Sequence, residues 1–174
     1  MQKRIVLVII GVLLLNVALA GDLKLKYKRY LNARFGYGIS YPEGLLIPQG
    51  EADNGDGQKF LSEEHDVEMA VWGGNNALDE TLHSRFLEHL QSKTNDHPNR
   101  NVTYKHLGRS WFVVSGFNGD KVFYNKTIFI NDTFLVLHIT YPKAKKTMLD
   151  PITSSISKSF KYLSTPKTEP LPTK

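Results

Sequence analysis

The clearest hydrophobic pattern in the chain runs from Ser110 to Tyr141, where apolar and polar positions alternate over three consecutive segments. Alternation with a period of two is typical of strands that bury one face. The dipeptides Asn118-Gly119 and Asn131-Asp132 separate the segments, and both favour tight hairpin turns because their residues tolerate positive φ. This stretch therefore predicts a three-stranded antiparallel meander.

The alternation sorts the side chains of the meander onto two faces. Two-residue loops would place Phe117 opposite Asp120 and Ile130 opposite Thr133. One face has Lys126 as its only charged residue, and we predict that it is a wall of the core. Its other members are Trp111, Val113, Phe117, Val122, Tyr124, Ile128, Ile130, Leu135, Leu137, Ile139 and Tyr141. The opposite face mixes apolar with polar side chains, so we expect only a partial cover over it.

This mixed face holds the best candidate for a functional site. The same register places Asn125 directly opposite His138, with Phe112, Phe123 and Thr140 close by. In one interpretation Asn125 and His138 simply bond to each other, because buried polar groups are normally satisfied by their neighbours. In the other they bind a ligand. The sequence leaves both interpretations open.

Two segments with a period of 3.6 predict the main helices. The first runs from Asp79 to Lys93, with Asn76 or Asp79 as its N-cap, and the second begins at Asp150-Pro151. Their apolar stripes are Leu78, Leu82, Phe86 and Leu90 in the first, and Leu149, Ile152, Ile156 and Phe160 in the second. Together with the meander they predict an α+β fold, an antiparallel β-sheet flanked by two helices.

Shorter segments before the first helix predict further strands. Phe35–Pro42 alternates, Lys59–Leu61 and Val67–Trp72 form a pair, and Leu45–Pro48 is expected to be a short buried continuation. The glycine-rich loop Gly50–Gln58 carries several carboxylates, but their spacing does not match a calcium-binding EF-hand loop. We therefore predict a polar hairpin turn there.

The N-terminus has the pattern of a signal peptide. Lys3-Arg4 precede an uncharged apolar run, and Ala18-Leu19-Ala20 fits the small-residue rule of signal peptidase. We predict a signal peptide over residues 1–20, and a retained membrane anchor is the alternative. The mature protein would be secreted or periplasmic, with one α+β domain over residues 21–163. The Pro-rich tail 164–174 has no apolar pattern and is predicted to be disordered.

Composition limits the possible chemistry. The absence of cysteine excludes disulfides, a thiolate nucleophile and a lipid-modified cysteine. The net charge of +5 falls to +3 when Lys3 and Arg4 are removed with the signal peptide, so a nucleic-acid partner is not expected. Much of this positive charge lies in Leu23–Tyr30, which is either a solvated edge strand or an arm that makes weak contact with anionic surfaces.

Residues at both ends of the domain resemble one known family. The pattern F-x-Y-x-I-x-Y-P is formed by Phe35, Tyr37, Ile39, Tyr41 and Pro42. The meander ends in Ile139-Thr140-Tyr141-Pro142, and the second helix carries Ile156, Ser159 and Phe160. With the strand-rich middle, these residues resemble the PsbP-like superfamily, the group of the photosystem II extrinsic P protein and DcrB-like folds, and in particular its exported bacterial members. The resemblance spans most of residues 30–162 and implies a sheet with helices on both sides.

No catalytic motif stands out. Ser115 lacks the first glycine of G-x-S-x-G and lies within a predicted strand, and His83 and His89 are too far apart around a helix to share a metal. Several acid–base groups cluster in one turn, namely Glu63, Glu64, His65, Asp66 and Glu68, where charges are usually solvated. We predict a non-enzymatic binding or accessory module of the cell envelope with a protein partner and without cofactor or metal. A hydrolase-type enzyme that uses carboxylate or histidine groups and a small-ligand carrier are the alternatives.

Overall fold

A computed structural model describes residues 25–91 and 99–163. The predicted signal peptide and the predicted tail both lie outside these residues. The elements are β1 (Tyr27–Asn32), β2 (Tyr37–Pro42), β3 (Ile47–Glu51), β4 (Gly57–Leu61), β5 (Glu68–Asn75), α1 (Leu82–Leu90), β6 (Arg100–Leu107), β7 (Trp111–Asn118), β8 (Lys121–Ile130), β9 (Thr133–Pro142), a 3-10 turn η1 (Lys143–Lys145), α2 (Lys146–Ser159) and β10 (Lys161–Tyr162). Within the described ranges, no helix has the length and apolarity needed to cross a membrane.

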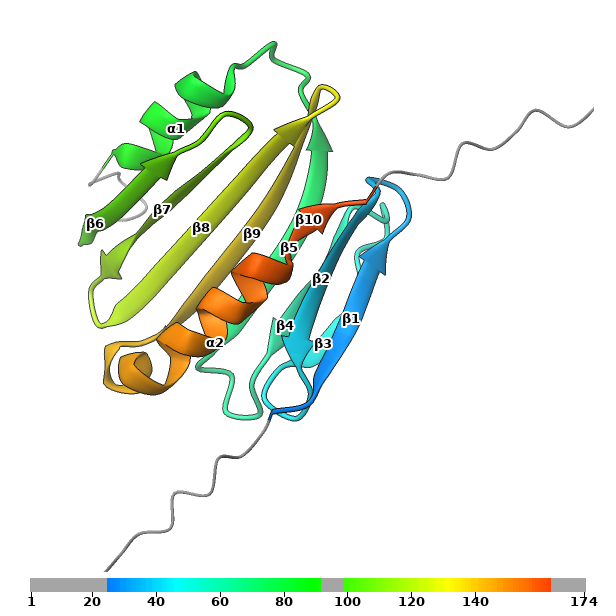
Figure 1. Cartoon of the computed structure of the whole chain (residues 1–174). Coiled ribbons are helices and arrows are strands. Elements are labelled where there is room, and N and C mark those ends of the chain that lie inside the picture. The colour runs from blue at the N-terminus through cyan, green and yellow to red at the C-terminus, as the bar shows by residue number, and fades with distance from the viewer. Residues whose placement is uncertain (1–24, 92–98, 164–174) are drawn as a thin grey trace, which may run out of the picture.

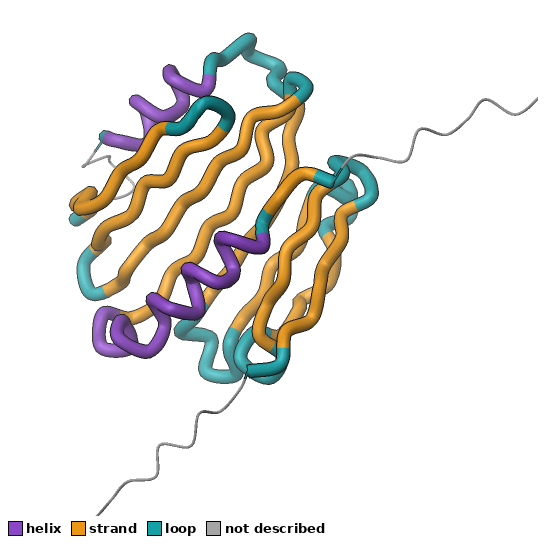
Figure 2. The backbone as a smooth tube through the Cα atoms, viewed as in Figure 1, coloured by secondary structure: helices purple, strands orange, loops and turns teal. Residues whose placement is uncertain are grey.

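The strands form two antiparallel sheets. The α+β prediction is confirmed, but the structure has a second, smaller sheet beside the single sheet that the sequence predicted. The large sheet has the order β3-β4-β5-β9-β8-β7-β6, and the small sheet has the order β1-β2-β10. Figure 1 shows α2 and the small sheet on one face of the large sheet, with α1 beside β6 at the far end. The two helices thus cover different parts of the large sheet (Figure 2).

Each face of the large sheet has its own hydrophobic core. The main core lies under α2 and the small sheet and includes Tyr37, Ile39, Phe60, Met69, Leu135, Leu137, Ile139, Leu149, Ile156 and Phe160. The second core lies under α1 and consists of Phe86, Phe112, Val114 and Phe123. This division follows the two predicted faces of the meander, and it confirms helices on both sides of a sheet.

One of the two predicted hairpin registers is confirmed and the other is wrong. In β8–β9, Ile130 pairs with Thr133, and both loop residues have positive φ, as the prediction requires. In β7–β8, Phe117 pairs with Val122 and not with Asp120, because the two-residue loop is Gly119-Asp120. The partner changes by two positions, so every side chain of the hairpin stays on its predicted face.

Both helices begin at other residues than predicted. The N-cap of α1 is Thr81, neither Asn76 nor Asp79, and Leu78 is 81% exposed outside the helix. The second helix begins at Lys146 and contains Pro151. The ion pair between Lys146 and Asp150, one turn apart, supports this additional turn.

The N-terminal strands agree only in part with the sequence pattern. From Tyr27 onward, the basic segment forms β1, an edge strand of the small sheet, as one interpretation expected. The loop before Gln58 is a hairpin turn between β3 and β4. However, Ile47 and Pro48 are exposed rather than buried, because they belong to the edge strand β3, whose residues are all exposed; the last buried residue before it is Leu46.

Candidate functional site

The position of α1 leaves part of the large sheet uncovered. This helix packs mainly on β7 and β6, so the same face of β8, β9 and β5 is only partly covered by it. The result is a cleft of about 610 Å³, which we call the α1 cleft. Its lining residues are Trp72, Arg85, Glu88, His89, Gln91, Arg100, Asn118, Lys121, Val122, Phe123, Asn125, Val136, His138 and Thr140.

Most of the predicted site residues meet in this cleft. Asn125, His138, Thr140 and Phe123 line it, and Asn125 lies directly opposite His138 as expected. The Asn125 Oδ1 atom is hydrogen-bonded to His138 Nδ1, and the Asn125 side chain is almost fully buried. Phe112 does not line the cleft, because it is fully buried under α1, where its ring contacts Phe86 and His89.

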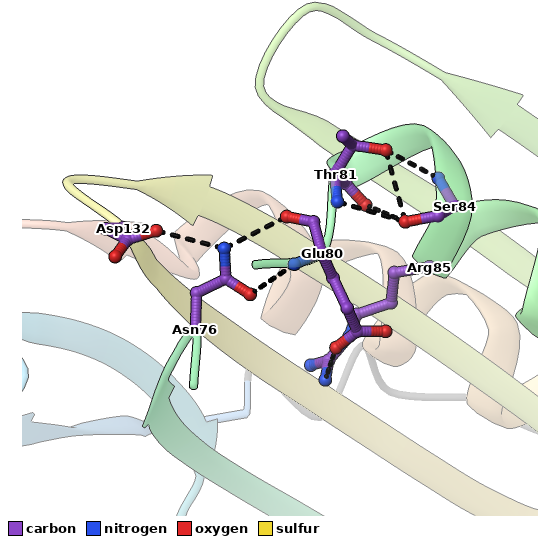
Figure 3. Close-up of polar contacts among 6 residues, drawn as sticks. All are labelled: Asn76, Glu80, Thr81, Ser84, Arg85 and Asp132. Carbon is purple, nitrogen blue, oxygen red and sulfur yellow. Dashed lines mark hydrogen bonds and ion pairs between the residues drawn. The ribbon is translucent and has the colours of Figure 1, made fainter. Parts of the chain in front are cut away.

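The segment before α1 is tied to the β8–β9 turn by one side chain (Figure 3). The Asn76 amide donates to the Asp132 carboxylate and to the main-chain oxygen of Glu80, both at 3.0 Å. The main-chain N–H of Glu80 donates back to Asn76 Oδ1 at 2.9 Å. Asn76 therefore fixes the entry to the helix relative to the sheet, a role different from the predicted N-cap.

A capping box then starts the helix. The main-chain N–H of Ser84 donates to Thr81 Oγ1, and the main-chain N–H of Thr81 donates to Ser84 Oγ, both at 3.0 Å. One residue further, Arg85 forms an ion pair of 2.7 Å with Glu80 (Figure 3). These contacts place Arg85 at the side of the helix that borders the cleft.

Two arginines of the cleft stack on phenylalanine rings of the sheet. The Arg85 guanidinium lies 4.1 Å from the Phe134 ring centroid, and that of Arg100 lies 4.3 Å from the Phe123 centroid. Arg100 also donates to the main-chain oxygen of Gln91, just after α1. Whereas Arg85 is paired with Glu80, no carboxylate in the described ranges forms an ion pair with Arg100. Stacking restricts both side chains without using the edges of their guanidinium groups.

The electrostatic environment of His89 reflects these cations. Burial, and then the positive charges of Arg100 and Arg85, lower the pKa of His89 to about 4, although Glu80 acts in the opposite direction. His89 is therefore neutral at pH 7. The arginines make the cleft a region of positive potential.

A second cleft, of about 560 Å³, lies on the other face of the large sheet beside α2, and we call it the α2 cleft. It is lined by Thr103, Tyr104, Trp111, Val113, Ser115, Gly116, Phe117, Val122, Tyr124, Lys126, Tyr141, Lys146, Asp150, Thr153, Ser154, Ser157 and Lys158. The half-buried Lys126 ammonium donates to the main-chain oxygens of Ser157 and Phe160, at 2.7 and 3.4 Å. Burial lowers the pKa of Lys126.

Several of the groups considered for catalysis form contacts with other parts of the protein. Ser115 Oγ donates to the main-chain oxygen of Phe123 at 2.8 Å. In the acidic turn, Glu64 and Asp66 share Lys145, and Glu68 pairs with Lys59. The part of the chain that the structure describes contains no group of three or more His, Asp or Glu side chains placed to hold a metal ion.

Sequence reasoning missed the cationic side of the α1 cleft. Arg85, Arg100 and Trp72 come from three different elements, and no local pattern connects them. One signal was present, because Arg85 and His89 are four apart and therefore share one side of a helix. That side borders the stripe through Phe86, which packs on the sheet.

Comparison with known proteins finds similarity in structure but not in sequence. No family model matches the chain, and no curated protein matches it. Among solved structures, it is similar to cyanobacterial PsbP (CyanoP) from Synechocystis sp. PCC 6803, with a TM-score of 0.61 and 13% identity over 82% of this chain and 95% of that one. It is also similar to the Ran-binding protein Mog1p of Saccharomyces cerevisiae, with a TM-score of 0.57 and 11% identity over 81% and 97% of the two chains.

A third structure, from Bacteroides thetaiotaomicron VPI-5482, has a TM-score of 0.50 and 12% identity, and the match covers 83% of this chain and 51% of that one. These comparisons confirm the PsbP-like fold indicated by the sequence resemblance. At 11–13% identity they transfer no functional residue.

Proposed function

We propose, starting from the PsbP-like fold of this chain, that the protein is an exported, non-enzymatic module that binds another component of the cell envelope in the α1 cleft. The observation that carries this proposal is the half-covered face of the large sheet, where α1 leaves a cleft lined by aromatic, amide and cationic side chains. The similar yeast structure is that of a Ran-binding protein, so a role in protein recognition is compatible with the fold.

The lining of the cleft resembles a protein-binding surface more than a reaction centre. Trp72 is 38% exposed, pairs with Val136 across β5 and β9, and lines the same cleft as the two stacked arginines. Tryptophan and arginine are the residue types that most often dominate binding energy at protein interfaces. An enzyme remains the alternative, but His138 is bonded to Asn125, and Ser115 lies outside this cleft.

Export rests on the N-terminal pattern alone. Cleavage after Ala20 would leave Gly21 as the mature N-terminus. Intact-mass measurement of the protein recovered from the secreted or periplasmic fraction tests this directly. Recovery of the full-length chain in the membrane fraction would instead support a retained anchor.

The binding role is tested by capture from the native envelope with the tagged mature protein. We expect Trp72→Ala to lose the captured component, because it removes the exposed aromatic side chain of the α1 cleft. The matched control is Tyr104→Ala, which removes an exposed aromatic side chain from the α2 cleft and should keep the component. Equal capture by both variants, or selective loss with Tyr104→Ala, would contradict the proposal.

A further inference from the structure

We infer that the α1 cleft recognises an acidic peptide segment, in extended conformation, of a protein partner. This inference rests on the proposed function and names the class of ligand that the same cleft takes. It is carried by the charge of the cleft, by the state of its two arginines and by their positions along the sheet.

The charge of the lining is positive. Among the described residues that line it, Arg85, Arg100 and Lys121 are cationic and Glu88 is the only carboxylate, while Glu80 pairs with Arg85 from outside the lining. Because His89 lies near both arginines and is neutral at pH 7, it neither adds to this charge nor cancels it. Charge complementarity therefore favours a ligand that carries carboxylates.

Both arginines are held in place for such a ligand, although Arg85 already shares its guanidinium with Glu80. Each is stacked on a ring of the sheet, Arg85 on Phe134 and Arg100 on Phe123, so little side-chain freedom remains to be lost on binding. The planar fork of a guanidinium matches a carboxylate with two parallel hydrogen bonds. In the described ranges Arg100 has no carboxylate ion pair that a ligand would have to break.

The positions of the stacking rings favour a peptide over a small anion. Phe134, Val136, His138 and Thr140 are alternate residues on one face of β9, and Phe123 pairs with Thr140. The two phenylalanines are thus separated along the sheet by six residues, or roughly 20 Å. Because the two arginines stack on rings at opposite ends of this register, an extended peptide of about six residues that lies along β9 would meet one arginine near each of its ends. Its central side chains would lie over Val136 and Trp72, which offer apolar contacts.

The test uses the mature full chain and a labelled eight-residue peptide with glutamates near both ends and leucines at its centre. Fluorescence anisotropy compares it with the same peptide carrying glutamine in place of glutamate. We expect at least tenfold weaker binding of the glutamine peptide. We also expect Arg100→Gln to weaken binding of the glutamate peptide by at least tenfold and Arg100→Lys by less, because lysine keeps the charge but not the fork.

The matched control is Lys158→Gln, which removes one positive charge from the α2 cleft and should change the affinity less than twofold. Melting curves establish which variants are folded. If Arg100→Gln does not fold, the peptide affinity of Arg100→Lys is used in its place. Equal binding of the two peptides, or an equal loss with Lys158→Gln, would overturn the inference. So would tighter binding of a phosphoserine version, or displacement of the peptide by millimolar inorganic phosphate, since either points to a phosphate site.

Failure of the inference can be told from failure of the proposed function. If capture from the envelope depends on Trp72 but Arg100→Gln has no effect on the peptide or on capture, the ligand is not acidic, although the cleft still binds the partner. If the glutamate peptide binds through Arg100 while capture is unaffected by Trp72→Ala, recognition of acidic peptides stands and the proposed envelope role fails.

Discussion

The two clefts lie on opposite faces of one sheet, and both combine aromatic with cationic side chains, but the fold uses the cations differently. In the α2 cleft, two of the three lining lysines are engaged by the fold: the Lys126 ammonium is bonded to carbonyl oxygens at the end of α2, and Lys146 is paired with Asp150. In the α1 cleft, Arg100 is stacked on Phe123 and donates to the main-chain oxygen of Gln91, and no carboxylate of the described ranges forms an ion pair with it. A cation in a cleft is available to a ligand only where the fold has not already satisfied it.

The attachment of the helices explains this difference. The end of α2 returns to the small sheet through β10, so its last carbonyl groups lie over β8, where Lys126 reaches them. The beginning of α1 is fixed by Asn76 to the β8–β9 turn, at one end of the sheet (Figure 3). From there α1 packs mainly on β7 and β6, and its flank with Arg85 and His89 borders the α1 cleft.

The largest expected effect is a pH dependence of the unfolding free energy that comes from His89 of the α1 cleft. The pKa of His89 is about 4 in the folded protein and about 6.5 in the unfolded chain, so the unfolded chain binds a proton first as the pH falls. The stability contributed by neutral His89 is complete above pH 6.5 and is lost between pH 6.5 and 4, by roughly 3 kcal/mol. Urea unfolding at several pH values should show this loss relative to His89→Gln.

In that experiment the unfolding free energies of wild type and His89→Gln converge as the pH falls from 7 to 4, because the other acids and bases are common to both proteins. Curves that stay parallel over this range would show that His89 is not the buried neutral group that the structure places beside Phe112. An NMR titration of the His89 ring provides an independent measurement of its pKa.

A second experiment tests the pair at the floor of the α1 cleft. Because Asn125 is almost fully buried and bonded to His138, we expect Asn125→Ala and His138→Ala each to destabilise the protein by on the order of 1–3 kcal/mol. The double variant should lose less than the sum, since either change breaks the same bond. Denaturant unfolding of the four proteins measures the coupling.

The alternative for this pair is a direct role in binding. Both variants would then keep the wild-type melting curve but lose capture of the envelope component. Small additive losses of stability with capture intact would contradict both interpretations, because they would leave Asn125 and His138 without any joint role.

The sequence predicted this pair but not the cleft around it. Asn125 and His138 follow from the Asn131-Asp132 turn and strict alternation, both local features. The predicted register of β7–β8 was wrong by two residues at Phe117. Because side chains alternate with a period of two, this error left every side chain on its correct face. Arg85 and Arg100 meet the sheet only because α1 docks beside β6, and that placement depends on contacts such as Asn76 with Asp132, far apart in the sequence.

A third experiment asks whether Lys126 is structural, as the comparison of the clefts implies. Lys126→Met removes the donor to the oxygens of Ser157 and Phe160, which should cost about 1–2 kcal/mol, partly offset because a buried charge is removed as well. Binding of the glutamate peptide should stay within twofold of wild type. If instead the variant loses the peptide and keeps its stability, the α2 cleft is the ligand site and the comparison is reversed.

The smallest effect concerns Gly119 in the β7–β8 loop, which joins two strands that contribute to both clefts. Gly119 has a φ of +58°, and a Cβ atom placed there would meet no atom within 4 Å, so only the backbone conformation opposes another residue. We expect Gly119→Val to cost about 1 kcal/mol or slightly more, because β-branched residues strongly disfavour positive φ. Gly119→Asn is the matched control and should cost less, since asparagine tolerates this region.

This change should lower the unfolding midpoint of the whole domain without favouring either cleft, because β7 and β8 carry the residues of both faces. The folded variant should therefore bind the glutamate peptide as wild type does. A melting temperature equal to that of wild type would show that the loop can adopt another turn, and a selective loss of peptide binding would show that the hairpin affects the α1 cleft alone.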